Sequence, residues 1–171
     1  IEDDRIIKIA PDLQAEADRV IDCTGLAVSP GFIDCHSHND WFAPRNNNER
    51  FFVPFLEQGI TTQVTGNCGA SPFGYDKGTK YHDLIGSGVM DITKIAEDTS
   101  TLPAYIAAIK NLPVNMVPLY GHESARVSVA GYDSRALTEE ELRHTEEILE
   151  QTLIDGATGI SFGLIYEPEP S

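Results

Sequence analysis

The chain has 171 residues and a formal net charge of −15, from 12 Lys and Arg against 27 Asp and Glu. This length is enough for one domain with a sizeable core, and 41% hydrophobic with 23% charged residues argues against wholesale disorder. No segment has the length and apolarity of a membrane span, and so acidic a surface repels phosphate backbones and anionic lipids. We therefore expect no nucleic-acid and no membrane partner. Three cysteines make no even disulfide framework, which favours a reducing, cytoplasmic location.

The first thirty residues indicate a small β element that precedes the main domain. Apolar and β-branched runs predict short strands over residues 5–9, 19–22 and 26–28, with turn residues between them. We expect residues 1–29 to form part of a small β-sandwich and residues 30–171 to form the main domain.

Strands and helices alternate along the main domain. The clearest helix signal is a capping box that begins at Thr138 with Glu141 three residues later. The stretch 67–100 has no sustained periodicity, which is typical of a functional loop. Strands are predicted to begin at Phe32 and to cover 60–65, 114–119 and 159–164, and helices to cover 49–58, 104–110 and 138–156.

This alternation predicts parallel strands joined by right-handed crossovers. An open, doubly wound sheet would fit four such units. Half of a (β/α)8 barrel, which typically needs about 250 residues, would fit them equally well. The pattern alone does not choose between the two architectures.

Two histidines and a cysteine follow neighbouring strands. In His36-Ser37-His38 both imidazoles point to one side, because side chains repeat every two residues in an extended chain. Cys68 follows the next strand, and parallel α/β proteins bind ligands at this carboxyl edge. These residue types predict a zinc site. The alternatives are a chance H-x-H in a surface loop and a buried, inert cysteine.

Other polar residues lie near the same edge. Asp40 could orient an imidazole through its second nitrogen. His122 ends the third strand of the main domain and could line the same mouth, although a hydrogen-bonded loop histidine is an equal alternative. Ser161 lies in a G-x-S-x-G pattern, but it falls within an apolar strand rather than on a strand-to-helix turn, which argues against a serine nucleophile.

The segment Val28-Ser29-Pro30-Gly31-Phe32-Ile33-Asp34-Cys35-His36-Ser37-His38 resembles the metal-dependent amidohydrolase superfamily. Residues 20–26 resemble the segment that leads into the barrel domain of that superfamily. Three further stretches resemble the N-acyl-D-amino-acid deacylase branch of that superfamily: residues 59–69, 119–122 and 156–168.

The resemblance implies the amino-terminal portion, about four βα units, of a (β/α)8 barrel that carries one or two zinc ions. It implies that His36 and His38 are metal ligands and that Cys68 replaces the carboxylated lysine of many relatives. It also implies that four residues support these ligands or line the substrate site: Asp40, Asn67, His122 and Tyr166.

The implied reaction is attack of metal-activated water on the amide of an N-acyl-D-amino acid, a small-molecule substrate, while an aspartate shuttles the proton. The resemblance places that aspartate and the remaining histidine ligands beyond Ser171. We therefore expect no catalytic residue in this chain, an incomplete and inactive site, and self-association through open barrel edges.

Three alternatives remain from the sequence. The first is a cyclic-amide hydrolase of the dihydroorotase or hydantoinase kind, although the expected strand 159–164 has no lysine at its carboxyl end. The second is a non-catalytic, self-associating module. The third is an open flavodoxin-like binding domain, which would give His36, His38 and Cys68 no role.

Overall fold

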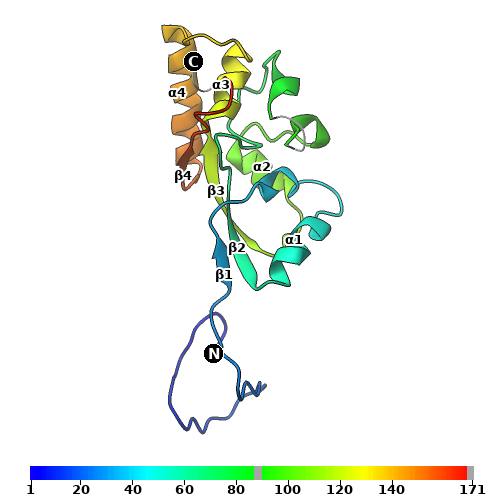
Figure 1. Ribbon diagram of the computed structural model, residues 1–171, viewed down its shortest axis with the longest axis vertical. Helices are drawn as coiled ribbons and strands as arrows, with labels where there is room; N and C mark the ends of the chain where they lie inside the picture. The colour runs from blue at the N-terminus through cyan, green and yellow to red at the C-terminus, as the bar shows by residue number, and fades with distance from the viewer. Residues whose placement is uncertain (87–89, 169–171) are drawn as a thin grey trace. The chain divides into compact units, whose positions relative to one another are not determined.

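A computed structural model describes residues 1–86 and 90–168 (Figure 1). The chain divides into two units, residues 1–30 and residues 31–171. The last three residues of the expected main domain therefore lie outside the described residues.

The first unit lacks the predicted strands. Among residues 1–30 the only β pairing is an isolated antiparallel bridge between Glu2 and Arg5. Ile6, Ile7 and Ile9 are exposed rather than packed. The prediction of strands over 5–9, 19–22 and 26–28 is wrong, because a β-branched composition forms a stable strand only where a partner strand and an apolar face receive it.

The second unit is built on a four-stranded parallel sheet with the strand order β1-β2-β3-β4. Sequential neighbours pair throughout, so the α/β class with parallel strands is confirmed. The strands are β1 (Phe32–Asp34), β2 (Ile60–Thr65), β3 (Asn115–Gly121) and β4 (Gly159–Ser161). The helices are η1 (Asn39–Trp41), α1 (Glu49–Leu56), η2 (His82–Leu84), η3 (Ile92–Lys94), α2 (Leu102–Ala108), α3 (His122–Ala130) and α4 (Glu139–Ile154).

Helices α1 and α2 share one apolar cluster with β3. Phe52 of α1 and Tyr105 of α2 are fully buried in it, and Met116 of β3 packs against them. Asn48 precedes α1 without a side-chain capping bond, and its amide donates instead to the backbone carbonyls of Ala43 and Asn111. Asn48 thus links the start of α1 to the segment between α2 and β3.

Helix α4 begins as predicted. The Thr138 hydroxyl accepts from the Glu141 amide at 3.3 Å, and the Glu141 carboxylate accepts from the Thr138 amide at 2.8 Å. The buried side of the helix is centred on Thr145 and Thr152, whose hydroxyls donate to carbonyls one turn earlier. These hydrogen bonds within the helix satisfy both hydroxyls, so Thr145 and Thr152 can face the core.

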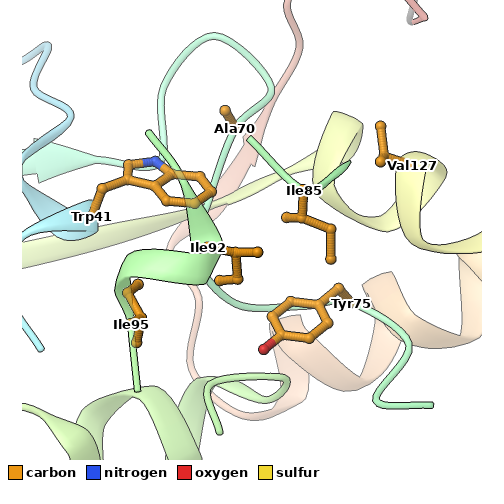
Figure 2. Packing of buried hydrophobic residues seen from close by; sticks show 7 residues of the cluster. All are labelled: Trp41, Ala70, Tyr75, Ile85, Ile92, Ile95 and Val127. Carbon is orange, nitrogen blue, oxygen red and sulfur yellow. The ribbon is translucent and has the colours of Figure 1, made fainter. Parts of the chain in front are cut away.

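The stretch 67–100 has a hydrophobic core of its own. Tyr75, Ile85, Ile92 and Ile95 pack together with Trp41, and Figure 2 shows these side chains beside Ala70 and Val127. Short 3-10 turns separate these positions, so no helical or strand period appears in the sequence. The described residues of this stretch are therefore a packed part of the fold, joined to Trp41 and Val127 outside it.

Two further differences from the sequence concern exposure and helix placement. The apolar residues that begin β1 would suit a buried strand, but Phe32 and Ile33 are 60% and 62% exposed, and β1 is an edge strand of the sheet. His122 does not end a strand; it begins helix α3. No helix within the described residues has the length and apolarity needed to cross a membrane.

Candidate metal centre

Three potential metal ligands lie at the carboxyl ends of two paired strands. His36 and His38 follow β1, and Cys68 follows β2. β1 and β2 run parallel, with Ile33 opposite Thr62 after a register shift at Phe32, so their carboxyl ends meet at one edge. The sequence prediction placed all three residues at this edge, and the structure brings them together.

The donor atoms of this trio are close enough to share one ion. One ligand atom from each of His36, His38 and Cys68 lies within 4.8 Å of the others. The Cys68 Sγ is 3.3 Å from the His36 Nε2, and the two imidazole rings meet edge-on at 71°. In a tetrahedral zinc site, ligand bonds of 2.0–2.3 Å put neighbouring donor atoms about 3.5 Å apart. Two imidazoles and a thiolate in this arrangement fit zinc.

The backbone turn after β2 presents the thiol. Cys68 has a φ of +57°, between Gly66 at +74° and Gly69 at +78°. A Cβ on Gly66 would lie 2.0 Å from the Leu119 carbonyl oxygen, so only glycine allows β3 to approach here. Non-glycine residues seldom adopt this left-handed region, and such strain often marks a functional site.

Hydrogen bonds hold this turn from two sides. The Asn67 side-chain amide donates to the Ser37 carbonyl at 3.2 Å and to the Val64 carbonyl at 2.9 Å. On the other side, the Ser161 hydroxyl donates to the Gly66 carbonyl and accepts from the Gly69 amide. Ser161 therefore helps to hold the turn that carries Cys68.

The electrostatics favour a neutral imidazole at His38. Partial burial, and secondly the neighbouring charge of His36, lower the pKa of His38. Its Nδ1 is buried and has no hydrogen-bond partner among the described residues. Neutral imidazole is the form that binds metal ions, so this environment suits a ligand.

Asp40 occupies a different position from the expected one. It is fully buried, and neither carboxyl oxygen forms a hydrogen bond with any described residue, so it does not orient an imidazole. Burial raises the pKa of Asp40 to about 8, partly opposed by the nearby backbone amides of Gly66 and Trp41. The short turn η1 turns the carboxyl inward, which strand alternation could not anticipate.

A cavity of about 510 Å³ adjoins the trio. His38 and Cys68 line it together with Tyr166, whose role at a substrate site stays a prediction. His122 lies outside its wall, and its ring packs at 5.1 Å against Phe162.

Sequence reasoning missed three residues that bring polar groups to the cavity wall. These are Glu123, Tyr132 and Glu167. Glu123 could have been suspected because it follows the carboxyl end of β3, where parallel sheets place functional groups. Tyr132 and Glu167 lie in turns and give no comparable signal.

The sequence profile of the Amidohydrolase family matches residues 19–169. The chain is 36% identical over 168 residues to an N-acyl-D-aspartate deacylase and to a D-aminoacylase of Alcaligenes xylosoxydans xylosoxydans. Each alignment covers 96% of this chain but 32% and 33% of the respective relative. The chain thus spans about a third of the length of these curated relatives.

Solved structures of deacylases also resemble this chain. A D-aminoacylase studied for its binuclear metal centre superposes with a TM-score of 0.64 and 30% identity, over 82% of this chain and 29% of that one. An N-acyl-D-glutamate deacylase of Bordetella bronchiseptica, complexed with zinc and a phosphonate inhibitor, superposes with a TM-score of 0.57 and 29% identity. That superposition covers 82% of this chain and 28% of the deacylase. The four parallel strands thus match part of a D-aminoacylase structure. With a profile match over most of its length, the chain belongs to the Amidohydrolase family.

Proposed function

We propose that this chain carries the amino-terminal metal-binding part of a zinc-dependent enzyme that removes the acyl group from N-acyl-D-amino acids. One observation carries the proposal: donor atoms of His36, His38 and Cys68 lie within 4.8 Å at the carboxyl ends of paired parallel strands. The deacylase names of the relatives supply the substrate class.

In this proposal each residue of the trio has a defined task. His36 and His38 supply neutral nitrogen donors, and Cys68 supplies a thiolate that offsets part of the ion's charge. Asn67 holds the two ligand-bearing segments in register through Ser37. A bound zinc ion would supply Lewis-acid polarisation of the amide carbonyl and activation of water.

The cavity beside the trio provides room for the substrate. Its volume of about 510 Å³ falls within the range of small-molecule sites. Tyr166 and Tyr132 give it apolar ring surface with polar tips. The proposal assigns no proton-transferring aspartate to residues 1–171.

Metal analysis tests the first half of the proposal. Zinc bound per chain is measured by mass spectrometry after dialysis, for the native chain and for Cys68→Ala and Cys35→Ala. Cys35 is the matched control, because it is an exposed free cysteine outside the donor trio. Roughly one zinc per chain, lost in Cys68→Ala and kept in Cys35→Ala, supports the site. Equal zinc in all three proteins contradicts it.

Hydrolysis assays test the second half. The zinc-loaded protein is given N-acetyl-D-amino acids, their L enantiomers, dihydroorotate and hydantoin. Release of free D-amino acid alone supports the deacylase. Ring opening of either cyclic amide instead supports the dihydroorotase-like or hydantoinase-like alternative. Zinc binding without any turnover points to a chain that holds metal but lacks the remaining catalytic groups.

A further inference from the structure

The cavity beside the metal trio has an acidic wall. Glu123 and Glu167 both line it, from α3 and from the segment that follows β4. No lysine or arginine is among its lining residues. Carboxylates that share a small cavity attract a cation and repel an anion, and a partly enclosed site strengthens both effects.

Glu123 is held rigidly at this wall. It is 9% exposed, and its Oε1 accepts a hydrogen bond of 3.0 Å from the Tyr132 hydroxyl. Burial, and then the charge of Glu123, raise the pKa of Tyr132, so the phenol remains a hydrogen-bond donor. Glu167 is more loosely held and accepts from Ser134 at 3.4 Å.

The arginines nearest to this wall are engaged with other groups. Arg126 is buried, does not line the cavity, and donates through Nη2 to the carbonyls of Asp133 and Arg135, while its Nη1 has no hydrogen-bond partner among the described residues. The charges of Glu141, Glu167 and Asp133 all act on this guanidinium, so its effect is divided among three carboxylates, of which only Glu167 lines the cavity. Arg135 forms a two-pronged ion pair with Glu141, at 2.7 and 2.8 Å. Neither guanidinium is therefore positioned to receive an acidic ligand in the cavity.

Aromatic groups complete the wall. The rings of Tyr132 and Tyr166 border the same space as the two carboxylates. Aromatic faces attract ammonium and guanidinium groups, most strongly where water is partly excluded. The wall therefore combines the two kinds of group that proteins use to recognise organic cations.

We propose that this cavity selects N-acyl-D-amino acids with a cationic side chain, an ammonium or a guanidinium, over those with an acidic one. This inference rests on the proposed function for the identity of the substrate backbone. The α-carboxylate is common to all such substrates, so its repulsion by the wall cancels when side chains are compared. The preference then reflects the side chain alone.

The test measures binding without turnover. The chain is freed of metal with a chelator and titrated, by two-dimensional NMR at neutral pH, with N-acetyl-D-lysine, N-acetyl-D-glutamine and N-acetyl-D-glutamate. We expect affinity to fall in that order, with lysine about tenfold above glutamate at low salt and less at high salt. Equal affinities, a reversed order, or no measurable binding of N-acetyl-D-lysine would overturn the proposal.

Two neutral variants locate the effect. Glu123→Gln keeps an oxygen that can accept from Tyr132, and Glu167→Gln changes a more loosely held side chain. Each should lower the lysine-to-glutamate ratio about threefold to fivefold. Glu150→Gln, on the exposed side of α4, removes the same charge outside the cavity and should leave the ratio unchanged. A ratio that falls equally in all three variants would mean only a response to net charge and would overturn the assignment.

Hydrolysis by the zinc-loaded protein, together with zinc binding itself, separates the side-chain preference from the proposed deacylase function. Hydrolysis of neutral or acidic substrates at least as fast as the lysine substrate would leave the deacylase standing and overturn the side-chain preference. Selective binding of N-acetyl-D-lysine by a chain that binds no zinc at the donor trio would support the cation preference and count against the deacylase.

Discussion

The side-chain amide of Asn67 donates to the carbonyl of Ser37, the residue between the two histidines, at a distance of 3.2 Å. Asn67 itself precedes Cys68. One buried amide thus connects both segments that carry the three donor atoms, so the spacing of the trio depends on it.

Replacing Asn67 with alanine should therefore weaken zinc binding. Residues that orient metal ligands typically contribute 10-fold to 100-fold in affinity, and we expect a loss of about tenfold. Competition with a zinc-sensitive dye measures it. Asn46→Ala, at an exposed position away from the trio, is the control and should bind like the native chain. Unchanged affinity in Asn67→Ala would show that the turn keeps its shape without the amide.

Replacing Gly66 with alanine should destabilise the fold. The new methyl group would meet the Leu119 carbonyl oxygen at 2.0 Å, in a backbone with a φ of +74°. We expect a loss of more than about 2 kcal/mol in the free energy of unfolding, measured in urea. Gly78→Ala is the control, because a Cβ there meets nothing within 4 Å. Equal stability of the two variants would contradict the close approach of β3.

The capping box of α4 should give the protein a defined acid sensitivity. Hydrogen bonds from Arg135, and then from the Thr138 backbone, lower the pKa of Glu141 from 4.5 to about 2. A carboxylate with a depressed folded pKa contributes stability above its unfolded pKa and loses that contribution as the pH falls through its folded pKa. The advantage of the native chain over Glu141→Gln should therefore be complete above pH 4.5 and shrink towards about pH 2.

Urea midpoints of both proteins across this range measure the effect. Glu139→Gln, in the same helical turn but outside the capping box, is the matched control for the loss of one carboxylate from this helix end. A constant gap between the native chain and Glu141→Gln down to pH 2 would argue against the ion pair with Arg135.

Self-association through the sheet edge remains a prediction. β1 is an edge strand with Phe32 and Ile33 more than half exposed, and such edges pair with other chains. Light scattering should show a mass that rises with concentration, and Ile33→Lys should suppress the rise. Ile154→Lys changes an equally exposed residue on α4 and should not. A concentration-independent monomer would contradict the prediction.

Local signals predicted much of the second unit. The β-branched run 60–65 matches β2 at both ends, and the capping box places the start of α4. The trio was predictable because His36, His38 and Cys68 follow strands that pair in parallel, and such strands end at one edge.

The features that sequence did not predict depend on tertiary contacts, which local patterns do not reveal. The isoleucines of the first unit suit a strand but find no partner there, and β1 is exposed although its residues are apolar. Asp40 points into the protein because η1 turns the chain after His38. Glu123 and Glu167 are distant in sequence, so their common cavity depends on how α3 and the segment after β4 pack.

The two hydrogen bonds of Ser161 have a consequence for the order in which the site forms. The thiol turn is secured by a hydroxyl more than ninety residues further along the chain. During synthesis, His36, His38 and Cys68 leave the ribosome well before Ser161, and contacts so distant in sequence form slowly. The thiol turn therefore has the support of Ser161 only once β4 has joined β3, so we expect this turn to be looser in a chain that ends before Ser161.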